Sequence, residues 1–464
     1  MPVKKGQQFE AEITNIAFGG KGLTRIDGFT VFVDQAIPGD HAVIRIYKKR
    51  KNYARARMVE LISPSPDRIT APCRYSGFCG GCTWQFLEYD KQLIYKRQHV
   101  ADAIAHIGLI KGIAVHPTLA SELIFGYRNK MEFSCSDRRW LLSDEMGRGD
   151  IDTNFAIGLH VPGTFYKVID TRACLIQPDL GNRILMDVRS FIRSSPRPVY
   201  GLRSHVGFWR FVMLRHSQAF DQWMVNLVTA EEDRQMLKPL GHLLMEKYPE
   251  VISVVNNITR RRAGVAIGEF EVPLSGKSTI SDKVGPYEFD ISANSFFQTN
   301  TLGAKRLYEV IKEYAELGGT ETVLDLYSGT GTIPIVLSES AGQVIGIEIA
   351  DSAVVDAVNN CKKNEIVNCK FLKGDIRNCL SEITRHPDVV IIDPPRAGMH
   401  HEVVHLVLDM GPDRIVYVSC NPTTLARDLG MMIDHYRILE VQPVDMFPHT
   451  YHVETVVKLA KKKV

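Results

Sequence analysis

The sequence lacks the features that mark membrane and secreted proteins. No apolar run approaches the roughly 18 residues that a membrane-spanning helix needs, and the first residues contain no apolar stretch of the signal-peptide kind. We also find no convincing internal repeat. We therefore expect a cytoplasmic protein with no membrane partner.

Cysteine is too sparse for a disulfide framework. The chain has nine cysteines in 464 residues, and a cytoplasmic compartment is reducing. Where such cysteines are grouped, their spacing points to a metal site or to catalysis.

An excess of charge of either sign is lacking as well, since the formal net charge is only +3. The distribution of charge is more informative than the total. Residues 1–62 hold eleven Lys and Arg against six Asp and Glu, so the basic excess lies at the N-terminus. With 45% hydrophobic and 23% charged residues, the chain has the composition of a globular protein of about three domains.

The first predicted domain, residues 1–62, alternates short apolar and polar runs. Turn clusters at 19–22 and 38–40 separate these runs, which predicts a small antiparallel barrel of the OB type. The run 48–51 is entirely basic and has tyrosines close by, which suits phosphate neutralisation and base stacking. A solvated loop is the alternative interpretation of this run.

A second region, residues 63–290, follows the linker-like segment 63–66 and reads as mixed α+β. A helix is expected over about 84–110, where it could pack on the third region, residues 291–464. Further strands are expected near 132–135, 155–160 and 223–228, and further helices near 178–194 and 231–247.

The third region, residues 291–464, alternates strands and helices. After a helix near 300–316, nearly continuous apolar strands are expected at 322–325, 344–348, 370–372, 389–393 and 415–418. Such strands predict a parallel sheet covered on both faces, with its ligands at the carboxyl ends of the strands.

Acidic residues stand at or just beyond the ends of the first four of these strands. A glycine-rich turn at 325–332 begins with Asp325, and the next strands lead to Glu348, Asp375 and Asp393. Glycine lets the backbone approach a ligand, and an acid after the second strand can bind ribose hydroxyls. An NAD site is the alternative, but the complete G-x-G-x-x-G pattern is missing after the first strand.

Cys420 stands where the fifth strand ends and another helix is expected to begin. Backbone N–H groups at such a position stabilise a thiolate, the nucleophilic form of cysteine. A buried structural cysteine is the commoner alternative.

Three other cysteines lie close together, Cys73, Cys79 and Cys82. Cys174 is the expected fourth member of the group, with Cys135 as its rival. Four thiolates bind either Zn²⁺ or an iron–sulfur cluster, and the spacing does not decide between the two.

Four segments in the third region carry a family resemblance. They are 294–300 (Asn-Ser-Phe-Phe-Gln-Thr-Asn), 393–396 (Asp-Pro-Pro-Arg), the Cys420 segment, and 445–454, which ends in Glu454. Together they strongly resemble the RNA uracil-C5 methyltransferases of the RumA/TrmA type. The basic barrel resembles a TRAM domain, and the cysteine group resembles that of the RumA-like branch. One departure is Tyr327-Ser328, where relatives often have Phe-Cys.

The resemblance implies a multidomain α/β protein: an N-terminal OB-like TRAM barrel, a central α+β domain with an iron–sulfur site, and a C-terminal class I (Rossmann-like) methyltransferase domain. It implies that Cys420 is the nucleophile, which adds to uracil C6, and that Glu454 is the base, which removes the C5 proton. The residues implied for S-adenosylmethionine are Gln298, Tyr327, Thr332, Glu348, Asp375 and Asp393.

The same resemblance extends to partners and metals. A [4Fe–4S] cluster is implied at Cys73, Cys79, Cys82 and Cys174, with zinc as the alternative. Phe296 could stack on an extruded base, with the core as its alternative place, and Arg128 is a further substrate candidate. The expected partner is RNA, with 23S rRNA favoured, and the expected state is a monomer.

Several other functions compete with this one. The same chemistry could act on the T-loop uridine of tRNA. Radical S-adenosylmethionine methylthiotransferases also join a cluster to a TRAM domain, but with a different cysteine spacing. RNA cytosine-C5 methyltransferases carry an extra cysteine beside the fourth-strand motif, which 393–396 lacks, and exocyclic-amine methyltransferases need no thiol. A non-catalytic RNA-binding protein is the remaining possibility.

Overall fold

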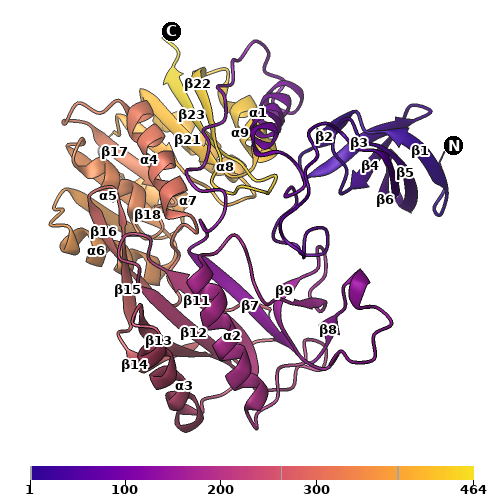
Figure 1. Ribbon diagram of the computed structural model, residues 1–464. Helices are drawn as coiled ribbons and strands as arrows, with labels where there is room; N and C mark the ends of the chain where they lie inside the picture. Colours follow the sequence, from indigo (N-terminus) through magenta and orange to yellow (C-terminus); the bar gives the residue numbers. More distant parts are fainter. Residues whose placement is uncertain (1–2, 263, 384–385, 464) are drawn as a thin grey trace.

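The computed structural model describes residues 3–262, 264–383 and 386–463. Figure 1 shows a separate N-terminal barrel, a central sheet domain and a C-terminal sheet covered by helices. None of the described helices is long and apolar enough to cross a membrane.

The N-terminal barrel is a six-stranded sheet in the order β1-β5-β6-β4-β3-β2. The prediction of an antiparallel barrel is wrong in one pairing, because β4 and β6 run parallel. A second difference is β3, which begins inside the glycine-rich cluster that was expected to form only a turn. The strands are β1 (Gln8–Glu12), β2 (Asn15–Ala17), β3 (Lys21–Ile26), β4 (Phe29–Asp34), β5 (His41–Lys49) and β6 (Tyr53–Ser63).

The central domain is built on an eight-stranded sheet in the order β14-β13-β12-β11-β7-β9-β10-β8. Helices α2 and α3 share one apolar core with this sheet. The elements are β7 (Lys130–Ser136), β8 (Arg139–Trp140), the short 3-10 helix η1 (Ser143–Glu145), β9 (Ala156–His160), β10 (Val168–Asp170), α2 (Asp179–Ser194), β11 (Trp209–His216), β12 (Trp223–Thr229), α3 (Arg234–Lys247), β13 (Val251–Ile258) and β14 (Phe270–Gly276).

The hairpin of β15 (Thr279–Val284) and β16 (Tyr287–Ser292) lies outside that sheet. Its apolar side chains share a core with helices and strands of the C-terminal domain. The C-terminal packing unit therefore begins earlier than residue 291.

The C-terminal domain is a seven-stranded sheet in the order β19-β18-β17-β20-β21-β23-β22. The five strands predicted to be parallel are parallel, and β23 runs antiparallel between β21 and β22. The elements are α4 (Thr301–Ala315), β17 (Thr322–Leu326), α5 (Thr332–Ser338), β18 (Gln343–Glu348), α6 (Asp351–Lys363), β19 (Cys369–Lys373), α7 (Ile376–Glu382), β20 (Val389–Ile392), α8 (His401–Met410), β21 (Arg414–Ser419), α9 (Pro422–Met432), β22 (Tyr436–Val444) and β23 (Glu454–Lys461).

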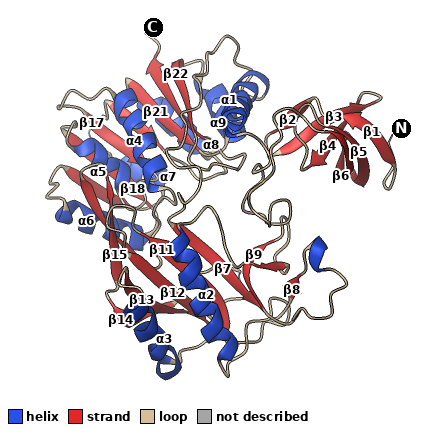
Figure 2. Ribbon diagram, viewed as in Figure 1, coloured by secondary structure: helices blue, strands red, loops and turns tan. Residues whose placement is uncertain are grey.

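Helices cover both faces of this sheet, as Figure 2 shows. Helices α4, α5 and α6 share one core with it, and α7, α8 and α9 share another. The second core also takes in α1 (Tyr89–His106), which comes before the central domain in the sequence and packs against α9. The helix expected over 84–110 is therefore shorter at both ends, and Trp84, Phe86 and Leu87 belong to a separate buried cluster.

Candidate active site

The topology brings three predicted site residues to one edge of the C-terminal sheet. Cys420 follows β21, Asp393 follows β20, and Glu454 is the first residue of β23. These strands are neighbours, and the antiparallel direction of β23 places its start at the carboxyl ends of the other two. Residues 27 or more positions apart in the sequence therefore converge at one place.

Two carboxyl groups at this edge of the sheet have raised pKa values. Burial raises the pKa of Asp393 to about 7. Burial, together with the charge of Asp393, raises the pKa of Glu454 to about 8. Both carboxyl groups therefore hold protons well above the usual range of a carboxylic acid.

The Cys420 thiol differs from the sequence expectation. Asn421 caps α9 by accepting a hydrogen bond from Thr423 N at 3.1 Å, so Cys420 does lie at a helix start. Burial and the nearby Glu454 and Asp393 carboxylates nevertheless raise the pKa of Cys420 to about 11. The expectation of a stabilised thiolate is therefore wrong for the free protein, because desolvation and two carboxylates outweigh the backbone.

Arg396 is the cation that opposes this effect. It is exposed, and its charge lowers the pKa of both Cys420 and Glu454. The sequence placed Arg396 in a motif but assigned it no role, and only the fold reveals its influence on both groups.

Two further buried groups lie near this edge. Asp325 is fully buried, and neither carboxylate oxygen has a hydrogen-bond partner within the described part of the chain. Burial, with the charges of Asp393 and Glu348, raises its pKa well above the usual range. Tyr308 of α4 is also buried, and its pKa is raised by burial and by Asp393. Sequence reasoning missed Tyr308, because a helical tyrosine resembles any other core residue.

A cavity of about 210 Å³ lies at the ends of β17, β18 and β19. Three predicted cofactor residues line it, namely Tyr327, Glu348 and Asp375. The remainder of the lining is mixed, with apolar side chains and two basic ones: Ile347, Ile349, Gly374, Ile376, Arg377, His400 and Val403. This is the composition of a ligand site, with apolar walls and a few fixed polar groups.

The backbone holds the acids of this cavity in place. Glu348 accepts hydrogen bonds from Gly329 N at 3.0 Å and from Ala350 N at 2.8 Å. Tyr327 has φ +67°, a left-handed conformation that is uncommon for a residue with a side chain. Asp375 pairs with Arg377, which lowers the pKa of Asp375 to about 2. Two carboxylates thus face the cavity in a fixed arrangement.

The predicted cofactor residues Gln298 and Thr332 and the substrate candidate Phe296 lie on the segments 294–300 and 330–332. The Gln298 carbonyl accepts a hydrogen bond from Asn129 Nδ2 at 2.8 Å, which ties this segment to the central domain. Thr332 is the first residue of α5. Phe296 is 67% exposed, so the core interpretation of this ring is wrong.

The four grouped cysteines line one pocket. Cys73, Cys79, Cys82 and Cys174 all contribute to its walls. Burial raises the pKa of Cys79 to about 11 and that of Cys82 to about 12, and nearby Cys174 adds to both shifts. The rival Cys135 does not line this pocket and lies in the core of the central domain.

The sulfur atoms in this pocket are not tightly clustered. Among the described residues, one group of three or more metal-ligand side chains has all its donor atoms within 4.8 Å of one another, and it is the exposed set His400, His401 and Glu402. No three of the four cysteine sulfurs therefore lie within 4.8 Å of one another.

Arg128 lies near both the grouped cysteines and the segment 445–454. Its backbone N–H donates to Ile176 O at 2.8 Å, and its charge lowers the pKa of Cys174 and of His452. The basic run 48–51 lies at the turn between β5 and β6, and Lys48, Arg50 and Lys51 are exposed there.

Comparison with known proteins agrees with this architecture. An uncharacterized RNA methyltransferase of Chlorobaculum tepidum is 40% identical over 464 residues, which cover 98% of this chain and 96% of the relative. Another, from Porphyromonas gingivalis, is 40% identical and covers 97% of this chain and 99% of the relative. The family described as tRNA (Uracil-5-)-methyltransferase matches residues 273–462. The chain belongs to the RNA uracil-5 methyltransferases.

Two further matches extend this family assignment. A TRAM domain matches residues 2–59, which confirms the interpretation of the barrel. A crystal structure of Pyrococcus abyssi tRNA (uracil-54, C5)-methyltransferase in complex with S-adenosyl-L-homocysteine is 29% identical, with a TM-score of 0.77, and covers 97% of this chain and 100% of that one. As a member of this family the protein is an S-adenosylmethionine-dependent RNA methyltransferase. This favours the resemblance over the methylthiotransferase, cytosine and non-catalytic alternatives.

Proposed function

We propose that the protein methylates C5 of uridine in RNA through a covalent adduct between Cys420 and uracil C6. The observation that carries this proposal is the convergence of Cys420, Glu454 and Asp393 at adjacent strand ends. Uracil C5 is a weak nucleophile, so the reaction needs both a thiol and a base at one place.

The described residues fit S-adenosylmethionine. Tyr327, Glu348 and Asp375 would hold the adenosine part in the apolar cavity that they line. Gln298, Thr332 and Asp393 are the further residues that we propose for the cofactor. The buried carboxyl of Asp325 lies two positions before Tyr327 of this cavity and has no hydrogen-bond partner among the described residues. It is the kind of group that a polar ligand satisfies. When bound, the cofactor supplies an electrophilic methyl group on a sulfonium.

The protein residues then act in sequence. Cys420 loses its proton to solvent, to which it is partly exposed, and its Sγ forms a bond to C6 as the electrons of the C5=C6 bond move to C5 and O4. Once C5 carries the methyl group, Glu454 takes the C5 proton. The electrons of that C–H bond restore C5=C6, and the C6–Sγ bond breaks with its electron pair on sulfur. Arg396 favours the ionised form of both Cys420 and Glu454.

The substrate base enters extruded from its strand or loop. The Phe296 ring is exposed and would stack on it, and Arg128 would offer a positive charge near His452. The basic turn of the TRAM barrel would bind phosphates at a distance from the chemistry. One chain carries every residue of this scheme, which supports a monomer.

The four-cysteine pocket suits a [4Fe–4S] cluster held by Cys73, Cys79, Cys82 and Cys174. Tetrahedral zinc with Zn–S bonds of about 2.3 Å needs sulfurs about 3.8 Å apart, and the wider spread of these sulfurs favours the larger cluster over zinc. Iron and sulfide analysis of protein purified without oxygen tests this. A colourless protein with one zinc would overturn it.

The favoured RNA is 23S rRNA, because the resemblance of the barrel and cysteine group is to the RumA-like branch. A specific observation favours tRNA as a second candidate. The Pyrococcus abyssi neighbour is named for uracil-54 of tRNA and matches this chain over nearly its whole length, barrel included. The barrel therefore does not exclude tRNA.

Mapping 5-methyluridine in total RNA with and without the gene separates the two RNAs. Loss of one or more 5-methyluridines from large-subunit rRNA is the expected result. Loss of 5-methyluridine from the tRNA T-loop alone would show that tRNA is the substrate. An unchanged map would refute the proposal that the protein methylates uridine.

Replacing the nucleophile tests the chemistry. Cys420→Ala is expected to bind S-adenosylmethionine normally and to lose methyl transfer by at least about a thousandfold, since the nucleophile is indispensable. Calorimetry and incorporation of labelled methyl groups measure the two properties. Normal turnover by this variant would refute the covalent mechanism.

A further inference from the structure

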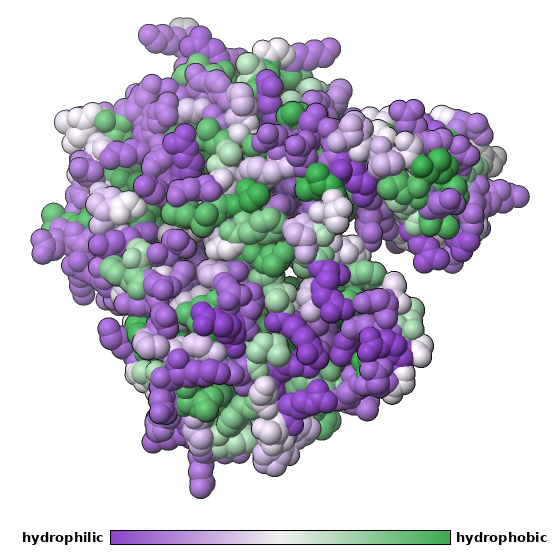
Figure 3. Space-filling model, viewed as in Figure 1, coloured by the Kyte–Doolittle hydropathy of each residue, from purple (hydrophilic) through white to green (hydrophobic). Residues whose placement is uncertain are grey.

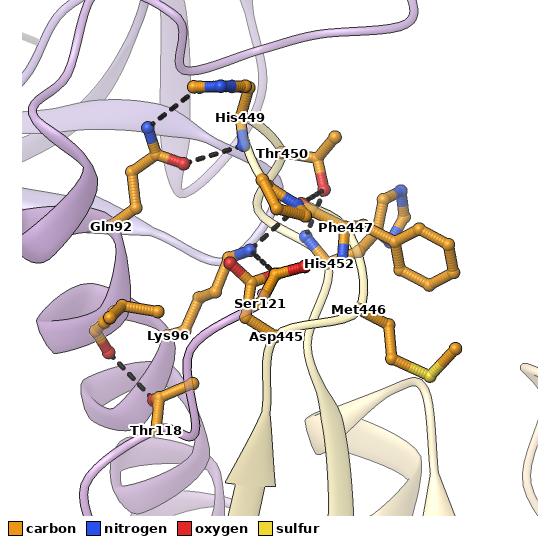
Figure 4. Close-up of polar contacts among 12 residues, drawn as sticks. Gln92, Lys96, Thr118, Ser121, Asp445, Met446, Phe447, His449, Thr450 and His452 are labelled. Atoms are coloured by element: carbon orange, nitrogen blue, oxygen red, sulfur yellow. Dashed lines mark hydrogen bonds and ion pairs between the residues drawn. The ribbon is translucent and has the colours of Figure 1, made fainter. Parts of the chain in front are cut away.

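The loop that leads into Glu454 is held by residues far from it in the sequence. It spans residues 445–453 between β22 and β23, and we call it the base loop. Lys96 of α1 donates to Asp445 Oδ1 at 2.6 Å and to Phe447 O at 3.0 Å. Both members of the Lys96–Asp445 pair are fully buried. Figure 4 shows Lys96 reaching from its helix into this loop.

Asp445 organises the first turn of the base loop. Its second oxygen, Oδ2, accepts from Tyr89 Oη at 3.0 Å, while Oδ1 also accepts from Phe447 N at 2.9 Å. The carboxylate therefore joins two residues of α1 to two positions of the loop. Removing one partner of such a buried pair leaves an uncompensated charge, so the geometry is strongly enforced.

A second clamp lies four residues further along the loop. Gln92 Oε1 accepts from His449 N at 2.8 Å, and Gln92 Nε2 lies 3.3 Å from His449 Nδ1. His449 has φ +65°, a left-handed conformation that a residue with a side chain adopts only when its surroundings hold it there. The His449 ring also stacks on the Phe125 ring, with a distance of 4.3 Å between the ring centroids.

The cysteine segment braces the same point. Thr83 N and Trp84 N both donate to His449 O at 2.9 Å, and Thr83 directly follows Cys82. The base loop is thus fixed on one side by α1 and on the other by the segment that carries three of the four grouped cysteines.

We infer that Lys96 and Gln92 of α1 are positioning residues, which hold the base loop so that Glu454 meets the C5 proton of the methylated adduct. This inference rests on the proposed function. Nothing in α1 touches the reacting atoms in the scheme above; its effect passes through the loop. A shift of the base by about 1 Å can cost about a hundredfold in rate.

The inference predicts which step fails. Formation of the Cys420–C6 bond and methyl transfer do not use Glu454. With Glu454 displaced, the C5 proton stays in place, the C6–Sγ bond cannot break, and the RNA remains attached to Cys420. A variant that merely unfolds would lose methyl transfer and attachment together.

Two variants and a matched control separate these outcomes. The double variant Lys96→Met/Asp445→Leu removes both buried charges at once, which is often neutral for stability. Gln92→Met removes the second clamp. His99→Leu is the control, because His99 is also a buried polar residue of α1, but its Nε2 lies 3.2 Å from Ile16 O of the barrel instead of the base loop.

The assay uses full-length protein, total RNA from cells that lack the gene, and S-adenosylmethionine labelled in its methyl group. The expected result for the double variant and for Gln92→Met is about a hundredfold lower kcat, with labelled RNA attached to the protein on a denaturing gel. Cofactor affinity and melting temperature should match those of the control. His99→Leu should turn over without attached RNA.

Turnover at the wild-type rate in both variants, or loss of turnover without attached RNA, would overturn the inference. Failure of the proposed function would be seen in the wild type instead, as a lack of label in RNA, and would overturn both.

Discussion

Asp445 and Asp325 are both fully buried in the C-terminal domain, yet their surroundings are opposite. Asp445 is paired with Lys96 and accepts from Tyr89 and from the backbone. Asp325 has no hydrogen-bond partner within the described residues, and Asp393 and Glu454 nearby have raised pKa values.

The difference separates two uses of buried charge. A saturated carboxylate fixes the geometry around it, since every alternative arrangement leaves a charge unpaired. Carboxyl groups without partners stay protonated more easily and are available to a reagent or a ligand. Asp445 of the base loop is a paired carboxylate that fixes geometry, whereas Asp325, Asp393 and Glu454 at the strand ends are carboxyl groups available to a ligand or reagent. The base loop and the strand ends meet at Glu454.

The largest effect should follow from removing the base at the strand ends. Glu454→Gln is expected to lower turnover by about 100-fold to 10,000-fold, the usual contribution of a general base. Methylated RNA should remain attached to Cys420, which a denaturing gel with labelled methyl groups detects. Rapid release of methylated RNA by this variant would assign the base to another residue.

The next effect compares how much the paired carboxylate of Asp445 and the carboxyl of Asp325 contribute to the stability of the fold. Lys96→Met alone should lower the free energy of unfolding by about 3–5 kcal/mol, because it leaves Asp445 buried without its cation. Denaturant titration at neutral pH measures this loss. The matched change Asp325→Asn removes no pair and should cost much less; equal losses would mean that the two carboxylates are not different in kind.

A smaller effect should follow from the cation beside the strand ends. Since the Arg396 charge lowers the pKa of Cys420 and of Glu454, Arg396→Met should raise both pKa values. Both groups react deprotonated, so kcat/KM should rise with pH from 7 to 9, and the variant should need a higher pH for the same rate. Because Arg396 is exposed and screened by salt, the deficit at pH 8 should not exceed about tenfold, the equivalent of one pKa unit. A pH profile shifted to lower pH would contradict this sign.

The smallest effect lies far from both sets of carboxylates, on the barrel. Lys48→Ala and Lys51→Ala should weaken RNA binding a few-fold without changing kcat, and each should lower the slope of log affinity against log salt by about 1. Binding measured at several salt concentrations checks this. Unchanged affinity and slope would favour the solvated-loop interpretation of this turn.

Much of the fold could be predicted from local sequence. The apolar strands of the C-terminal sheet and the helix near 300–316 are recognisable from the sequence pattern. The turn clusters of residues 1–62 predict a small barrel, and the resemblance to a family identifies it as a TRAM domain, which the match over residues 2–59 confirms. Strand β3 was not, because glycines that usually mark turns lie at its start. The roles of the strand-end and cysteine residues stay predictions.

The base loop network could not be predicted. Lys96 in a helical segment has the pattern of an exposed side chain, and its partner lies 349 residues away. The raised pKa of Cys420 likewise depends on two carboxylates from other strands. Both features arise from tertiary packing, which single-sequence patterns do not contain.

The face shown in Figure 3 gathers apolar surface near its middle, where the domains meet, and is polar over most of the remainder.

The pairing of α1 with the base loop also has a consequence for synthesis. A ribosome adding roughly 5 to 20 residues per second would deliver Asp445 roughly 20 to 70 s after Lys96, given their separation of 349 residues. During that interval the lysine and the apolar face of α1 lack the partners that bury them in the finished protein. The nascent chain is therefore expected to need shielding by chaperones until its last strands emerge.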